Sequence, residues 1–140
     1  MKALYASHII EHSARPLNTG LLVPADIDFR EDNAMCGDHI HLTMRISEEG
    51  IITGIGWEGT GCAISRASAS IFYNQVLGQS VGALKHFDRA MLLQLLGIEL
   101  PEQRMKCAVL ALRTFKVGVW GNTGEFDDND KCLIMPEHMR

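Results

Sequence analysis

Apolar and polar residues alternate most regularly near the middle of the chain. Isoleucine, leucine and methionine occupy every second position of residues 40–46, and residues 51–57 repeat this alternation after a turn at Gly50. A period of two is typical of a strand with one face on a core. The pattern therefore predicts an antiparallel hairpin, with residues 21–30, which Pro24 interrupts, as an edge strand beside it.

The second half of the chain has helical periodicity instead. Apolar residues recur at every third or fourth position over residues 64–76 and 105–119. Shorter helices are predicted for residues 3–13, 80–86 and 88–96. Apart from the first helix, strands precede helices, which predicts an α+β fold. We expect a three-stranded antiparallel sheet with the helices packed on one face.

The length of the chain, 140 residues, is typical of one domain. We expect a single domain over residues 1–120. Residues 121–140 contain Asp127, Asp128 and Asp130, and we expect them to form a loose acidic tail.

The net charge of −4, without a block of lysine or arginine, argues against a nucleic-acid partner. Neither a secretory signal nor an 18-residue apolar run is present, so no membrane association is expected. These features predict a cytoplasmic protein, a monomer or weak homo-oligomer. In that reducing compartment cysteines more often serve metals or catalysis than disulfides.

Three of the four cysteines lie in settings that favour an ionised sulfur. Cys36 begins a turn between two predicted strands, and Cys62 follows a glycine-rich run at the start of a predicted helix. Cys107 follows the cations Arg104 and Lys106. Helix N-termini and nearby cations lower a cysteine pKa, and the thiolate is the form that binds metals.

A metal site needs these distant cysteines to meet, because the sequence has no Cys-x-x-Cys pair. Gly37 allows a turn in which Cys36 and Asp38 point the same way, so Asp38 is a candidate fourth ligand. Three thiolates and one carboxylate suit iron or zinc. The alternative is that the cysteines are small buried core residues.

Four segments occur in the order and at the intervals typical of one known family. They are Pro16-Leu17-Asn18-Thr19-Gly20, Cys36-Gly37-Asp38, Gly59-Thr60-Gly61-Cys62-Ala63-Ile64-Ser65-Arg66-Ala67-Ser68-Ala69-Ser70 and Arg104-Met105-Lys106-Cys107-Ala108. In these segments the chain resembles the IscU/SufU family of iron–sulfur cluster assembly scaffolds, along roughly residues 4–118.

The resemblance implies a SufE/IscU-like fold and a scaffold rather than an enzyme. Such a scaffold builds a [2Fe–2S] cluster and transfers it to apo-proteins or carrier proteins, with a cysteine desulfurase as sulfur donor. The resemblance also implies the ligands of the cluster, or of an iron or zinc ion: Cys36, Asp38, Cys62 and Cys107.

An alternative function is a zinc-dependent sulfurtransferase that accepts persulfide sulfur from the desulfurase. Lys106 stands where IscU proteins usually have histidine, as in the SufU branch, but the chain lacks the usual SufU insertion between Cys62 and Cys107. Residues 100–104 also depart from the motif through which IscU proteins engage a chaperone. We predict Cys107 as the persulfide acceptor, because Arg104 and Lys106 would favour its thiolate.

A cysteine hydrolase is a third hypothesis, with Cys62 as nucleophile and His39 or His41 as base. It explains neither Cys36 nor Cys107. The alternation of the strand places both histidines on its exposed face, and we expect them to be surface residues. The remaining cysteine, in the predicted tail, is expected to be an incidental thiol.

Overall fold

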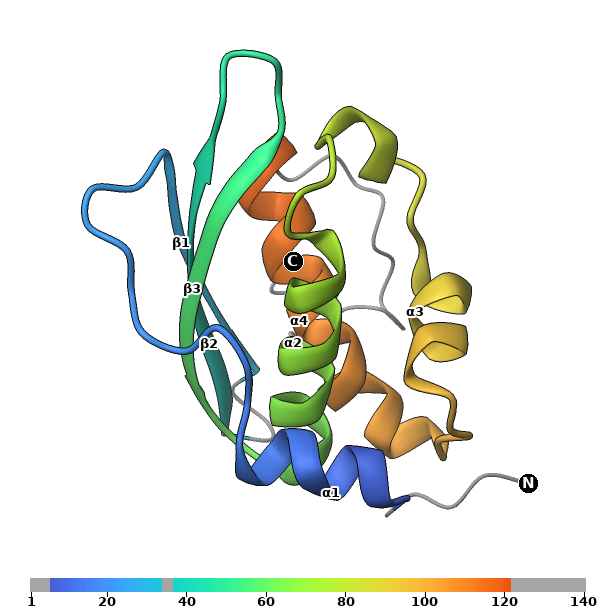
Figure 1. Ribbon diagram of the computed structural model, residues 1–140. Coiled ribbons are helices and arrows are strands. Elements are labelled where there is room, and N and C mark those ends of the chain that lie inside the picture. The colour runs from blue at the N-terminus through green and yellow to red at the C-terminus, as the bar shows by residue number, and fades with distance from the viewer. Residues whose placement is uncertain (1–5, 34–36, 122–140) are drawn as a thin grey trace, which may run out of the picture.

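The computed structural model of the chain describes residues 6–33 and 37–121, which form one sheet and a set of helices (Figure 1). The elements are α1 (Ser7–Ala14), β1 (Ile27–Asn33), β2 (Asp38–Ile46), β3 (Ile52–Thr60), α2 (Ala63–Val76), the 3-10 turn η1 (Gly82–Leu84), α3 (Arg89–Leu96) and α4 (Glu102–Trp120). Both strand pairings are antiparallel, in the order β1-β2-β3. The predicted α+β fold is confirmed.

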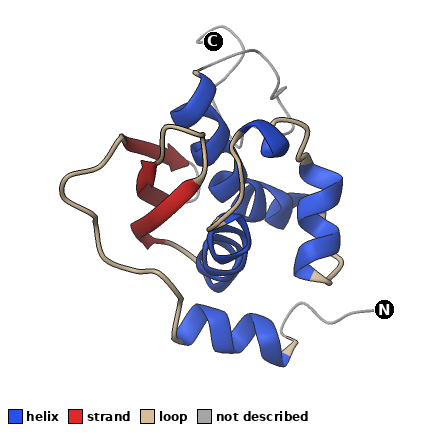
Figure 2. Ribbon diagram, turned by 45° about the horizontal axis from the view of Figure 1, so that its top comes forward, coloured by secondary structure: helices blue, strands red, loops and turns tan. Residues whose placement is uncertain are grey.

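One face of the sheet carries the core. Leu42 on β2 pairs with Trp57 on β3 and with Phe29 on β1, and Leu42 and Trp57 are fully buried. Helix α4 packs across β1 and β2, and α2 packs against β3 and α4. Figure 1 and Figure 2 show these helices on the same side of the sheet, with α3 beyond them.

The opposite face of the sheet is covered by the connection between α1 and β1 (Figure 1). Here the backbone N–H of Gly20 donates to Trp57 O at 2.9 Å, and that of Leu22 donates to Thr43 Oγ1 at 2.9 Å. A Cβ at Gly56 would collide with Gly20 O, so this close approach requires glycine. The prediction of a strand from residue 21 was therefore wrong for its first half. Because proline has no N–H for a strand ladder, regular pairing begins only at Ile27.

The helix predictions hold for the long helices and fail for one short one. Asp88 caps α3, since its Oδ1 accepts from the Met91 N–H at 3.0 Å. The helix predicted over 80–86 is only the 3-10 turn η1. Cys36, Cys132 and all of the predicted tail except Gly121 lie outside the described residues, so the domain boundary stays a prediction.

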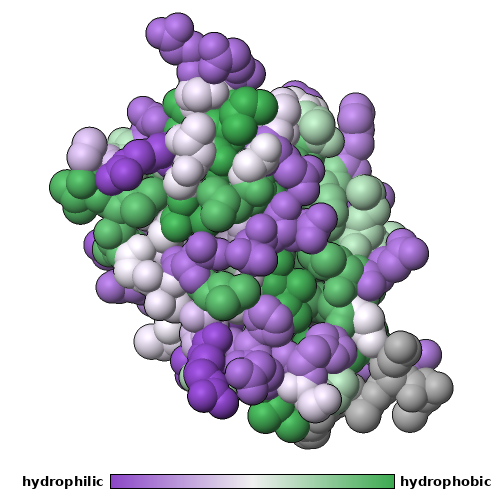
Figure 3. Space-filling view, in the orientation of Figure 1, coloured by the Kyte–Doolittle hydropathy of each residue, from purple (hydrophilic) through white to green (hydrophobic). Residues whose placement is uncertain are grey.

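The surface is mixed in polarity. Figure 3 shows hydrophilic and apolar residues interspersed over the face seen in Figure 1. Isolated exposed apolar side chains such as Val23 and Met91 are ordinary for a globular protein. Within the described residues, every helix is too short or too polar to cross a bilayer.

Candidate metal centre

The start of β2, the end of β3 and the starts of α2 and α4 lie at one end of the fold. Strand β2 begins at Asp38, and its register with β3 brings Thr60 opposite His39. The chain then turns through Gly61 into α2, which Cys62 precedes as the N-cap residue. Helices α2 and α4 both begin at the lower end of the molecule in Figure 1, where Cys107 lies near the start of α4.

This arrangement brings three of the four predicted ligands together. One side-chain ligand atom each from Asp38, Cys62 and Cys107 lies within 4.8 Å of the other two. Asp38 and Cys107 are buried, at 2% and 3% exposure, and Cys62 is partly exposed. The fourth predicted ligand, Cys36, lies outside the described residues, two positions before Asp38.

The two oxygens of the Asp38 carboxylate differ in their hydrogen bonding. Its Oδ1 accepts a hydrogen bond from the Cys62 backbone N–H at 3.2 Å. Its Oδ2 is buried and has no hydrogen-bond partner among the described residues. A buried acceptor without a donor is costly, and such a group often marks an ion site. Oδ2 therefore suits a cation held beside the two sulfurs.

Hydrogen bonding between the thiols sets their pKa values apart. The Cys107 thiol donates a hydrogen bond to the Cys62 sulfur, and the backbone amides of Ser65 and Ile64 donate to it as well. Together these hydrogen bonds lower the Cys62 pKa to about 5, although burial acts to raise it. The same hydrogen bond, burial, the Cys62 charge and the neighbouring Asp38 carboxylate raise the Cys107 pKa. These opposite shifts favour the thiolate at Cys62 over Cys107, although the flanking cations had suggested Cys107.

The donor set can hold a metal ion. Two sulfurs and one carboxylate oxygen supply three of the four positions of a tetrahedral zinc or iron site. Cys36 is close enough in the chain to be the fourth ligand, and that assignment stays a prediction. Thiolates bind both metals strongly, while the single oxygen makes the site less permanent than four thiolates.

The two histidines near the site belong to another network. His39 Nδ1 lies 2.9 Å from Asp32 Oδ1, and His41 Nε2 lies 2.6 Å from Asp28 Oδ1. Successive side chains of a strand point to opposite faces, so both lie across the sheet from Asp38. The expectation of an exposed His41 was wrong, because it is only 8% exposed and is held by Asp28 of the neighbouring strand. These carboxylate partners leave the hydrolase hypothesis without a base near the sulfur.

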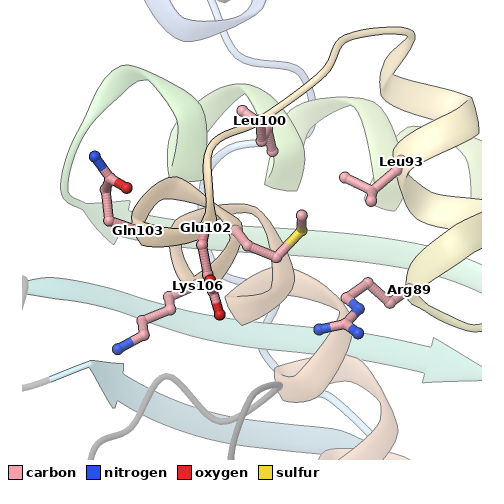
Figure 4. Close-up of a pocket in the computed structure, with 7 residues that line it drawn as sticks. Arg89, Leu93, Leu100, Glu102, Gln103 and Lys106 are labelled. Carbon is pink, nitrogen blue, oxygen red and sulfur yellow. The ribbon is translucent and has the colours of Figure 1, made fainter.

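A separate surface pocket of about 720 Å³ lies between α3 and the start of α4 (Figure 4). Arg89 and Leu93 line it from α3, and Glu102 and Lys106 line it from α4. None of the three ligands that meet is among the described residues that line it. The pocket is therefore a neighbour of the metal centre and not the centre itself.

Sequence reasoning missed Ser65, which supports Cys62 from the first turn of α2. Its Oγ donates to the Cys62 carbonyl at 3.0 Å, and its backbone amide faces the Cys62 sulfur. A serine three positions after a helix N-cap is a usable signal, since that amide is among the unpaired donors of a helix start.

Comparison with known proteins agrees with this geometry. Residues 4–126 match the family model of the NifU-like N-terminal domain. The chain is similar to the zinc-dependent sulfurtransferase SufU of Bacillus subtilis (strain 168), at 30% identity over 136 residues, covering 85% of this chain and 91% of SufU. It is also similar to the iron–sulfur cluster assembly scaffold protein IscU of Streptococcus pyogenes serotype M1, at 33% identity over 135 residues, covering 83% of this chain and 82% of IscU.

Solved structures give the same fold. The crystal structure of FiSufU from Fervidobacterium islandicum AW-1 matches with a TM-score of 0.70 at 23% identity, covering 82% of this chain and 96% of FiSufU. This likeness confirms the architecture of one antiparallel sheet covered by helices.

Proposed function

Because the chain belongs to the NifU-like N-terminal domain family, we propose that it is an iron–sulfur cluster assembly scaffold. It builds a [2Fe–2S] cluster on Cys36, Asp38, Cys62 and Cys107 and transfers it to apo-proteins. The observation that carries this proposal is the meeting of Asp38, Cys62 and Cys107 within 4.8 Å. The similarity to an IscU scaffold supports it.

The position of the Asp38, Cys62 and Cys107 ligands suits a cluster that is released to another protein. Cys62 is partly exposed, so a cluster bound there lies near the surface, where an acceptor protein can reach it. The Asp38 carboxylate is a harder and weaker ligand for iron than a thiolate. Exchange of this oxygen for an incoming acceptor thiolate is therefore the step at which release begins.

The proposed partners follow from this role. A cysteine desulfurase supplies sulfur as a persulfide, and apo-proteins or carrier proteins receive the cluster. Cys62 and Cys107 are free thiols, which agrees with work in the cytoplasm or another reducing compartment.

A zinc-dependent sulfurtransferase is the second candidate, because the chain is also similar to SufU of Bacillus subtilis. In this function Cys36, Asp38, Cys62 and Cys107 would hold a zinc ion, and one thiolate would receive sulfur from the desulfurase. Lys106, which stands where IscU proteins usually have histidine, favours this candidate.

Anaerobic reconstitution distinguishes the two functions. We expect the protein, mixed with ferrous iron, L-cysteine and a cysteine desulfurase, to gain a visible charge-transfer absorption that stays with it on gel filtration. The Cys107→Ala variant in the same mixture is the control and should stay colourless. A wild-type protein that stays colourless, keeps zinc and activates the desulfurase would favour the sulfurtransferase instead.

The predicted persulfide acceptor is Cys107, flanked by Arg104 and Lys106. Cys107 loses its thiol proton to a base of the partner, its sulfur takes the sulfane sulfur of the desulfurase persulfide, and the desulfurase cysteine leaves as a thiolate. The low pKa of Cys62 makes it the rival acceptor. Alkylation and mass mapping after mixing with desulfurase should place the added sulfur on Cys107; label confined to Cys62 or Cys36 contradicts this prediction.

A further inference from the structure

The turn that leads into α2 passes directly over the Asp38 carboxylate. Gly61 has a φ of +144°, a backbone conformation that residues with a side chain rarely adopt. A Cβ at this position would collide with Asp38 Oδ1 and would lie 2.6 Å from Ser65 Oγ. The absence of a side chain at Gly61 therefore makes room for the carboxylate.

The two oxygens of that carboxylate have different surroundings. Asp38 Oδ1 accepts from the Cys62 N–H, at the residue that begins α2. Asp38 Oδ2 is buried without a hydrogen-bond partner in the described part of the chain. A carboxylate can offer a metal one oxygen or both, but here one oxygen already has a donor.

We infer that Asp38 divides its two oxygens between two tasks and that Gly61 is the positioning residue that maintains this division. Oδ1 fixes the backbone of Cys62 at the start of α2, and Oδ2 is the single oxygen offered to the metal. The metal part of this inference rests on the proposed function. The part that concerns Oδ1 and the Cys62 amide does not.

Because Asp38 is buried, the separate roles of its two oxygens depend on the absence of a side chain at Gly61. Asp38 is 2% exposed and has a short side chain, so its carboxylate cannot shift and still keep its position beside the two sulfurs. A methyl group on residue 61 occupies the space of Oδ1 and displaces the whole carboxylate. The metal then loses its oxygen ligand, and the Cys62 N–H loses its acceptor.

The first test is a double-mutant cycle on zinc affinity, measured by competition with a chelator. Since a supporting residue of a metal site is worth about 10- to 100-fold in affinity, Gly61→Ala should weaken zinc binding by that factor. When Gly61→Ala is added to Asp38→Ala, the zinc affinity of the double variant should differ by less than about 3-fold from that of Asp38→Ala alone, because both substitutions remove the same oxygen ligand. The electronic spectrum of bound Co²⁺ should be alike in all three variants and differ from wild type.

Gly78→Ala is the matched control. Gly78 also has a positive φ, +90°, but no described atom lies within 4 Å of a Cβ built there, at the far end of α2. Its substitution also strains the backbone but does not touch Asp38, and zinc affinity should stay at the wild-type value. A Gly61→Ala protein that binds zinc as tightly as wild type, or effects of Gly61→Ala and Asp38→Ala that multiply, would overturn the inference.

The second test needs no metal. Asp38→Asn keeps an acceptor for the Cys62 N–H but removes the charged ligand oxygen, whereas Asp38→Ala removes both. Hydrogen exchange of the Cys62 amide in metal-free protein should therefore stay slow in wild type and Asp38→Asn and become faster in Asp38→Ala. Equal exchange in all three would overturn the role of Oδ1. A wild type that binds neither Zn²⁺ nor Co²⁺ would refute the metal centre, and this exchange test would still stand.

Discussion

Replacing Cys62 or Cys107 by alanine is expected to weaken zinc binding by about 100- to 1000-fold. Structural zinc sites bind their metal with roughly 10–16 kcal/mol, so one of four ligands contributes about 2.5–4 kcal/mol. Both sulfurs lie in the group whose ligand atoms are within 4.8 Å of one another. Competition with a chromogenic chelator measures the change, and circular dichroism checks that the variants remain folded.

Two further cysteines complete this experiment. Cys36→Ala should weaken zinc binding by a similar factor if Cys36 is the fourth ligand. Cys132→Ser is the matched control, because Cys132 is predicted to be incidental, and its zinc affinity should equal that of wild type. Wild-type affinity in either Cys62→Ala or Cys107→Ala would exclude that sulfur as a ligand.

Replacing Cys107 by alanine is also expected to raise the pH at which Cys62 ionises, from about 5 toward the ordinary thiol value. The hydrogen bond from Cys107 is the largest cause of the low Cys62 pKa, and alanine cannot donate it. Burial opposes ionisation in both proteins. The variant should therefore be mostly thiol at neutral pH, where the wild type is thiolate.

The ultraviolet absorption of the thiolate, followed against pH in metal-free protein, measures this shift. Cys36 and Cys132 are replaced by serine in both proteins, so that only the coupled pair can contribute. Thiolate absorption should appear near pH 5 in the reference protein and several pH units higher after Cys107→Ala. An unchanged midpoint near pH 5 would mean that the helix amides at Ser65 and Ile64 alone stabilise the thiolate.

This coupling bears on both proposed functions. A thiolate at Cys62 is ready to bind iron or zinc near neutral pH, whereas the raised pKa of Cys107 makes its ionisation depend on the incoming metal or on a partner. Metal binding would then release the Cys107 proton, because a ligating sulfur must be deprotonated. The order of ligand binding would begin at Cys62.

Local features of the fold could be predicted where a repeat in the sequence reports burial directly. Residues 40–46 alternate because β2 has one face on the core, and residues 64–76 follow helical spacing because α2 packs along one side. Residues 21–26 were mispredicted because their pairing depends on a close approach to Gly56 on a distant strand.

For the metal centre, the sequence by itself determined the chemistry of the ligands: two thiols and a carboxylate in turns and helix starts that favour negative charge. Only the tertiary structure decided that they meet, that Oδ1 and Oδ2 of Asp38 differ, and that Cys62 ionises before Cys107. The physical reason is the distance along the chain over which each interaction acts. Periodicity and turn residues act over a few positions, whereas hydrogen bonding and burial at this site join residues that only the packing of the sheet and the helices brings together.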